Sequence, residues 1–188
     1  MTGYAQYPLV QKALAEQAEI FRHAESGVPP MLAAATLRAL ELIDRHVAAP
    51  DTDKECILTV AVLMHCPPYL ALKSTRFTAD YHPQVQAMLD THTKSSGVTA
   101  ANTDLVQVYS AMFIANAENL RAAIQATTAA DRAWLRDIRD SLGGYAEDRE
   151  VFASAIAPGL RQIEEALIAD TMAILNAKLA PPPKPPKN

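Results

Sequence analysis

The chain has 188 residues, of which 49% are hydrophobic and 20% are charged, as in an ordinary globular protein with a sizeable core. Its formal net charge of −4 supplies no basic surface, which argues against nucleic-acid binding. No apolar run reaches the roughly 18 residues that a membrane span needs, and the N-terminus lacks the apolar segment of a signal peptide. We therefore expect a soluble, cytoplasmic protein that engages neither nucleic acid nor a membrane.

The spacing of apolar residues, at intervals of three and four along most of the chain, predicts an all-α fold. Helix breaks are expected at Ser26-Gly27, Pro67-Pro68 and Gly143-Gly144. We expect a single domain over residues 1–180, a bundle of about eight helices, and a disordered proline-rich tail at 181–188. The predicted helices span residues 9–24, 31–47, 53–66, 83–94, 102–127, 130–142, 148–157 and 160–179.

The third predicted helix is apolar nearly all round over residues 57–64, which predicts a place at the centre of the bundle. Thr52 and Glu55 stand three residues apart just before this run, which is the spacing of a capping box at a helix N-terminus. The two cysteines, Cys56 and Cys66, both fall in this helix. Two such positions on one helix are too far apart for a disulfide, so we expect two buried, reduced thiols.

Four sequence blocks resemble the hydrolase (HD) domain of the RelA/SpoT alarmone enzymes. They are YHPQVQAMLDTHTK at 81–94, ILTVAVLMHC at 57–66, and two further segments at 26–34 and 112–121, and they follow the family's order at plausible spacing. The resemblance implies an HD-like helical bundle. It also implies the family's chemistry, in which a divalent cation held by histidines and aspartates activates water for pyrophosphate hydrolysis.

The metal ligands of that family fall, by this resemblance, on Ala33, His65, Cys66 and Ala115, the last of which precedes Asn116. Only His65 keeps the residue type that the family uses. A divalent cation needs several fixed nitrogen and oxygen ligands, and one imidazole with a thiol and an amide is a poor substitute. We therefore expect no bound cofactor, with Mn²⁺ or another divalent metal left as the alternative.

The catalytic carboxylates of the family fall on Tyr69 and Leu70, neither of which is an acid of that kind. The basic pair that helps hold a guanine nucleotide in the family falls on Ala24-Glu25. The resemblance thus implies a pseudoenzyme with a degenerate metal site, which has the frame of a hydrolase and lacks most of its reactive groups. The sequence favours the absence of enzyme activity without deciding it.

The polar residues left for a remnant cleft each have a structural alternative. His65 at the end of an apolar helix is more often a core histidine bonded to a neighbour than a ligand, and Cys66 more often a small buried hydrophobe than a nucleophile. Glu118 and Asn119 face the cleft in the family, or else lie on the solvated side of a long helix. The candidate remnant site comprises His65, Cys66, Ala33, Asn116, Glu118, Asn119 and Tyr69.

Three functions follow from these patterns. The leading hypothesis is a catalytically inactive HD-like domain that acts as a binding or regulatory protein, for an unknown protein partner or a small nucleotide-like ligand. The first alternative is an active phosphohydrolase or pyrophosphohydrolase of altered specificity that uses His65. The second alternative is an oligomeric interaction subunit.

Overall fold

The fold is all-helical in a computed structural model that describes residues 3–23, 30–65, 81–94, 103–128 and 131–181. These residues form seven α-helices and two short 3-10 helices without a strand, which confirms the predicted fold class. Most of the predicted proline-rich tail lies outside the described residues. The elements are η1 (Gly3–Gln6), α1 (Pro8–His23), α2 (Pro30–His46), α3 (Asp51–Met64), α5 (Pro83–Lys94), α6 (Thr103–Ala126), α7 (Arg132–Arg149), η2 (Ala153–Ala155) and α8 (Pro158–Leu179).

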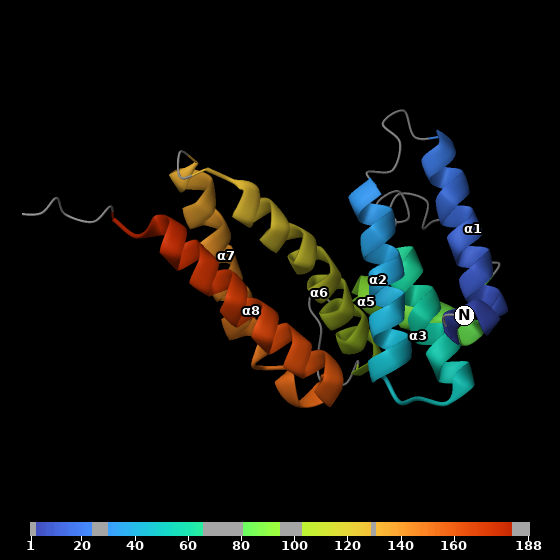
Figure 1. The fold of residues 1–188 in the computed structure, drawn as a ribbon. Helices are drawn as coiled ribbons and strands as arrows, with labels where there is room; N and C mark the ends of the chain where they lie inside the picture. The colour runs from blue at the N-terminus through green and yellow to red at the C-terminus, as the bar shows by residue number, and fades with distance from the viewer. Residues whose placement is uncertain (1–2, 24–29, 66–80, 95–102, 129–130, 182–188) are drawn as a thin grey trace, which may run out of the picture.

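The helices form two groups that share α6. Helices α1, α2, α3 and α5 gather at one end, and α6 runs from them to the other end, where α8 packs against α6 and α7 packs against α8 (Figure 1). The larger apolar cluster fills the first group and extends onto α6. The smaller cluster joins the far part of α6 to α7 and α8. Within the described residues, no helix combines the length and the apolar character needed to cross a membrane.

Helix α3 lies at the centre of the first group, as its all-round apolar sequence predicts. Every residue from Cys56 to Leu63 is buried. The helix contacts α1, α2, α5 and α6. Its burial follows from the sequence because a helix with no polar face is stable only when other elements cover all of its sides.

The capping box predicted at Thr52 and Glu55 is wrong. Helix α3 begins at Asp51, directly after Pro50, and no side chain caps it. Glu55 instead accepts a hydrogen bond from the backbone N–H of Leu9 at 2.9 Å. The first N–H groups of a helix lack partners inside that helix, and here the carboxylate of Glu55 serves the start of α1. The residue therefore ties α1 to α3.

The helix break predicted at Gly143-Gly144 is also wrong, because α7 runs through both glycines to Arg149. The predicted helix at 148–157 is replaced by the end of α7 and the short η2. Each glycine costs about 1 kcal/mol relative to alanine inside a helix. Buried residues on both sides of the pair, among them Leu142 and Arg149, offset this cost by packing against the rest of the molecule.

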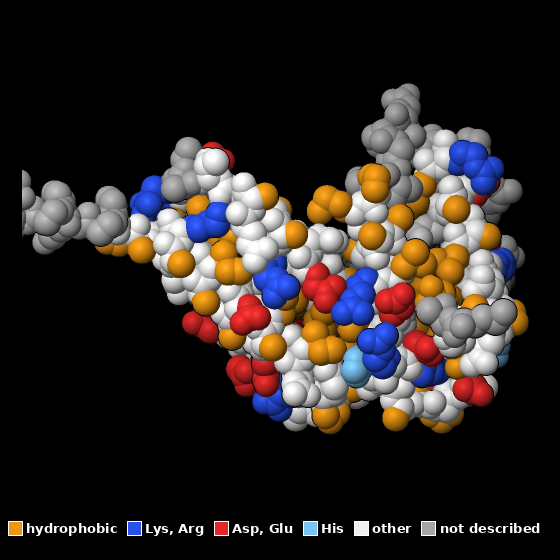
Figure 2. Space-filling model, viewed as in Figure 1, with side chains coloured by type: hydrophobic (Ala, Val, Ile, Leu, Met, Phe, Trp, Pro, Cys, Tyr) orange, Lys and Arg blue, Asp and Glu red, His pale blue; other side chains and the backbone are white. Residues whose placement is uncertain are grey.

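The charged side chains on one face of the molecule alternate in sign. Figure 2 shows Lys and Arg side chains interleaved with Asp and Glu side chains across the middle of this face. Elsewhere in the described residues, opposite charges also pair across helices, as Arg38 does with Glu118 and Arg121 with Asp170. This face therefore presents no extended surface of a single charge.

Candidate functional site

His65 directly follows α3, and its backbone N–H donates to the carbonyl of Ala61 at 3.2 Å. Its side chain is 3% exposed, and burial lowers its pKa to about 4, so the imidazole is neutral near pH 7. Among the described residues, none forms a hydrogen bond with its Nε2 atom. His65 is therefore a buried, neutral imidazole whose Nε2 atom has no partner in the described part of the chain.

The other positions of the predicted remnant site lie in different environments. Ala115 is buried on α6, whereas its neighbour Asn116 is exposed and donates its side-chain amide to the carbonyl of Met112 on the same helix, at 2.9 Å. Ala33 is exposed on α2 and lines an open surface depression. Cys66 and Tyr69 lie outside the described residues. Asn116 and Ala33 thus face solvent while His65 lies in the interior.

Glu118 forms a two-point contact with Arg38. Its two carboxylate oxygens accept hydrogen bonds from the Nη2 and Nε atoms of Arg38 at 2.9 and 3.0 Å. These hydrogen bonds raise the pKa of Arg38. The pair joins α2 to α6 with the paired geometry that arginine and carboxylate favour. Asn119, the next residue, is half-buried on α6. Both carboxylate oxygens of Glu118 are therefore hydrogen-bonded in a contact between two helices.

A divalent cation does not fit the described part of the chain. Within it, His, Cys, Asp and Glu side chains form no group of three or more that could hold a metal ion. A hard cation needs several oxygen or nitrogen donors aimed at one point. Around the resembled positions the described donors are the neutral imidazole of His65 and an exposed amide bonded to its own helix.

A cavity that the sequence did not predict lies between α6 and the segment that joins α7 to α8. Its volume is about 200 Å³, its walls are mostly apolar, and it is partly open to solvent. The described residues that line it come from the first half of α6, from the last two turns of α7, and from the positions on either side of η2. They are Val106, Tyr109, Ser110, Tyr145, Asp148, Arg149, Phe152 and Ile156.

Two sets of contacts hold the walls of this cavity in place. The buried side chain of Gln107 accepts a hydrogen bond from the backbone N–H of Ala157 at 2.8 Å and donates one to the carbonyl of Ala155. These bonds fix η2 and its flank against α6. The ring of Tyr145 stacks on Phe113 with a centroid distance of 3.9 Å, which fixes α7 against α6. The cavity therefore has a rigid frame on two sides.

A buried polar network lies at the edge of the cavity. Arg149 donates from Nε to Glu164 Oε2 at 2.8 Å, and the hydroxyl of Tyr145 donates to the other oxygen of the same carboxylate. Burial, followed by the hydrogen bond to Glu164, raises the pKa of Tyr145, so its hydroxyl stays protonated. The network satisfies Glu164, which is 0% exposed on α8.

Two buried polar atoms of the cavity residues have no hydrogen-bond partner among the described residues. They are the hydroxyl oxygen of Ser110 and the Nη2 atom of Arg149. The carboxylate of Glu165 lies 3.8 Å from this Nη2 atom, which is an ion-pair contact beyond hydrogen-bond distance. Leaving a buried donor without an acceptor costs about 1–3 kcal/mol. Both atoms are themselves shielded from the cavity as well as from solvent, so neither is open to a molecule that enters it.

The charge around Arg149 is more than compensated by acidic groups. Glu164 contacts the guanidinium at 2.8 Å, Glu150 at 3.1 Å and Glu165 at 3.8 Å. Asp148 also lines the cavity. Even with Arg161 paired to Glu165 at 2.8 Å, the carboxylates outnumber the guanidinium groups. The cavity is therefore unfavourable for an anion, although an arginine lines it.

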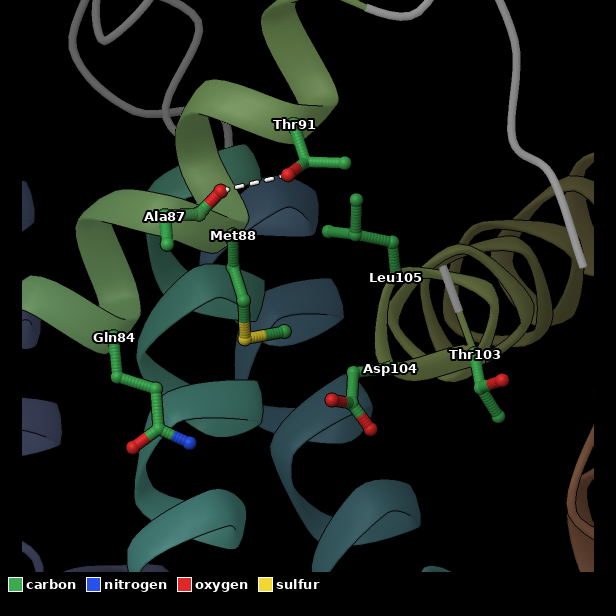
Figure 3. Close-up of a pocket in the computed structure, with 7 residues that line it drawn as sticks. All are labelled: Gln84, Ala87, Met88, Thr91, Thr103, Asp104 and Leu105. Atoms are coloured by element: carbon green, nitrogen blue, oxygen red, sulfur yellow. Dashed lines mark hydrogen bonds between the residues drawn. The ribbon is translucent and has the colours of Figure 1, made fainter. Parts of the chain in front are cut away.

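A second, more open pocket lies where α5 meets the start of α6. Figure 3 shows Met88 of α5 and Asp104 of α6 pointing toward the middle of this pocket, and Thr91 bonded to the carbonyl of Ala87. Burial, and then the nearby charge of Asp53, raises the pKa of Asp104. Its position on the first turn of α6 also suits a carboxylate, which the helix dipole stabilises.

The thiol of Cys56, the cysteine that the structure describes, is unreactive. The sulfur of Cys56 lies 2.8 Å from the sulfur of Met88, and the side chain is 2% exposed. Burial raises the pKa of its thiol to about 12. A protonated, buried thiol is neither a nucleophile nor a metal ligand. Cys56 is therefore a buried, reduced thiol, as the sequence predicted.

One signal in the sequence could have pointed to the buried network. Glu164 falls within the buried stripe of α8, which repeats at helical spacing through Leu160, Leu167, Thr171 and Leu175 and is apolar except for Thr171. A carboxylate inside such a stripe requires a buried cation or donor. The sequence did not identify that partner, because Arg149 lies on another helix, beyond the helix break predicted at Gly143-Gly144.

No protein-family model, curated protein or solved structure matches this chain. The resemblance to the HD hydrolases therefore stays a prediction that rests on the four sequence blocks.

Proposed function

We propose that this chain is a non-catalytic binding or regulatory protein, on a helical frame similar to that of the HD hydrolases. The observation that carries the proposal is the state of His65. It is the one metal-ligand residue type that the resemblance retains, and it is a buried, neutral imidazole without a hydrogen-bond partner for Nε2 among the described residues. A buried nitrogen of this kind is out of reach of a substrate water.

The surroundings of the remaining polar candidates support the same proposal. General-base catalysis requires a group within hydrogen-bond reach of the reacting water. Glu118 is held by Arg38, and Asn116 is bonded to its own helix. Neither joins His65 in a reactive group. A binding role requires only a shaped, desolvated surface, and such a surface exists at the cavity beside α6.

The experiment is a hydrolysis assay on the purified, dialysed chain with guanosine tetraphosphate, with and without added Mn²⁺. We expect no turnover and no retained metal. The assay is repeated with His65→Ala and with His82→Ala, which removes an exposed histidine as a matched control. Metal-dependent turnover that His65→Ala abolishes and His82→Ala preserves would replace this proposal with the hydrolase alternative.

A further inference from the structure

We propose that the cavity beside α6 receives the proline-lysine run at residues 181–187 of a second copy of this chain, so that the protein associates head to tail. Such an assembly goes beyond the proposed function, because it forms whether or not the chain is catalytic. The cavity is partly open to solvent, and its lining includes none of the positions that the HD resemblance implicates.

The walls of the cavity suit proline rings. Three of the lining residues, Tyr109, Tyr145 and Phe152, are aromatic, and the lining surface is almost wholly apolar. Aromatic-lined grooves are a recurring site for proline-rich segments, whose backbone conformation the proline rings set in advance. The volume of about 200 Å³ has room for a pyrrolidine ring, since apolar cavities of about 150 Å³ take up benzene.

The mouth of the cavity is acidic. Asp148 lines the cavity and is exposed, and Glu150, which follows the lining residue Arg149, is 63% exposed. The charge of Arg149 is already balanced in the interior, because its side chain is 5% exposed and contacts the buried Glu164 at 2.8 Å. The exposed carboxylates therefore leave a local negative charge at the surface, which attracts a cationic partner.

The proline-lysine run carries the complementary groups. Its sequence, PPPKPPK, contains five prolines, two lysines and no acidic residue. Of this run the structure describes only Pro181, so its form is inferred from the sequence. Consecutive prolines favour the polyproline II helix, whose three residues per turn place Lys184 and Lys187 on one edge and prolines on the other two. The run therefore offers apolar rings to the aromatic walls and two ammonium groups to the acidic mouth.

The run is too short to reach the cavity of its own chain. It leaves α8 at Ala180, whose φ of −57° and ψ of 143° are close to polyproline II values, and α8 leads away from η2 (Figure 1). Glu164, at the edge of the cavity, lies about 24 Å back along α8 at about 1.5 Å per residue. From Pro181 to Lys187 the run measures about 19 Å at about 3.1 Å per residue, so its prolines fall short even when folded back. A second copy supplies the cavity instead.

The first test is sedimentation velocity of the full chain over a range of concentrations. We expect the sedimentation coefficient to rise with concentration, and the rise to diminish at high salt because exposed charges take part. Two double variants address the two sides of the contact. Lys184→Glu with Lys187→Glu reverses the charge of the run, and Asp148→Lys with Glu150→Lys reverses that of the mouth. Each should weaken association by at least about tenfold, because it brings like charges together.

A matched control makes the same change of charge elsewhere on α7. Asp137→Lys with Asp140→Lys alters two exposed positions that do not line the cavity, and it should associate as the wild type does. Pro182→Ser with Pro185→Ser keeps both lysines and removes two rings, so it should weaken association as well. Circular dichroism verifies the fold of every variant, and the variants of the run carry the test where the variant of the mouth does not fold.

A mixture of the two charge-reversed variants tests the head-to-tail arrangement. The variant of the run keeps an intact cavity, and the variant of the mouth keeps an intact run. Their equimolar mixture should therefore form a dimer at a concentration where neither variant associates alone. A mixture that stays monomeric, while the wild type associates, would overturn the docking of the run into the cavity.

A sedimentation coefficient that stays at the monomer value at every concentration would overturn the inference, and would leave the cavity and the run to other occupants. Association that the charge-reversed run retains, or that the control variant loses, would overturn the assigned contact. These outcomes are independent of the hydrolysis assay. Turnover of a nucleotide would remove the proposed non-catalytic function, whereas a monomer without turnover removes only this contact.

Discussion

Arg149 donates from Nε to Glu164 at 2.8 Å, with the two side chains 5% and 0% exposed. The pair joins the last turn of α7 to α8 and lies at the edge of the cavity beside α6. Taking both charges out of water is costly, and their attraction with the added hydrogen bond from Tyr145 offsets that cost. The pair therefore fixes the geometry of this end of the molecule more than it adds net stability.

Removal of one partner of this pair should destabilise the fold strongly. Arg149→Met leaves the carboxylate of Glu164 buried without its cation, and we expect the free energy of unfolding to fall by about 3–5 kcal/mol. Urea denaturation followed by circular dichroism measures the change. The double variant Arg149→Met with Glu164→Leu should recover most of the loss, because it removes both charges and fills the space with apolar atoms.

The exposed pair of Arg161 and Glu165 is the control for this prediction. Its side chains are 43% and 47% exposed at a contact of 2.8 Å. Because solvent screens such pairs, Arg161→Ala should leave the urea midpoint nearly unchanged. A loss of similar size in Arg161→Ala and Arg149→Met would contradict the importance assigned to burial.

The sequence allowed correct prediction of the features that depend on local pattern. An all-round apolar run predicts the central position of α3, and helical spacing predicts the fold class. The predictions were wrong where packing, or a contact with another helix, outweighs a local sequence preference. Glu55 caps the start of α1 instead of α3, and packing carries α7 through Gly143 and Gly144. The cavity beside α6 was not predicted because residues distant in sequence, such as Ser110 and Arg149, line it together.

Acid should destabilise the protein through His65. Its pKa is about 4 when folded and about 6.5 when unfolded, so the unfolded chain takes up a proton first as the pH falls. The stability that neutral His65 contributes is present in full above about pH 6.5 and is lost on descent toward pH 4. The whole window corresponds to about 3 kcal/mol, of which about 2 kcal/mol is lost by pH 5.

The measurement compares urea unfolding of the wild type and His65→Leu at about pH 7 and about pH 5. Other groups titrate in both proteins, so the difference between the two isolates His65. We expect the variant to gain about 2 kcal/mol relative to the wild type on going to the lower pH. A difference that stays constant with pH would show that His65 is solvated enough to be protonated in the folded state.

The contact between Arg38 and Glu118 should contribute modestly to stability. Both side chains are about one third exposed, at 32% and 35%, so solvent screens the pair. We expect a double-mutant cycle with Arg38→Met and Glu118→Gln to give a coupling energy below about 1 kcal/mol that shrinks at high salt. A coupling of several kcal/mol, or one insensitive to salt, would mean that the pair is more desolvated than its exposure indicates.

The glycines of α7 and α8 should respond in opposite directions to the same substitution. A Cβ atom at Gly143 or Gly144 meets nothing within 4 Å, whereas one at Gly159 falls 2.5 Å from Nδ1 of His46. Alanine at position 143 or 144 should therefore raise the free energy of unfolding by about 0.5–1 kcal/mol, because it lowers the entropy of the unfolded chain without a clash. Gly159→Ala should lower the free energy of unfolding, because α8 or the end of α2 must move to make room.

Thermal and urea unfolding of the three single variants measure both effects. Stabilisation by Gly159→Ala would mean that His46 rotates away at little cost, and destabilisation by Gly143→Ala would mean that the helix is interrupted at the glycines after all.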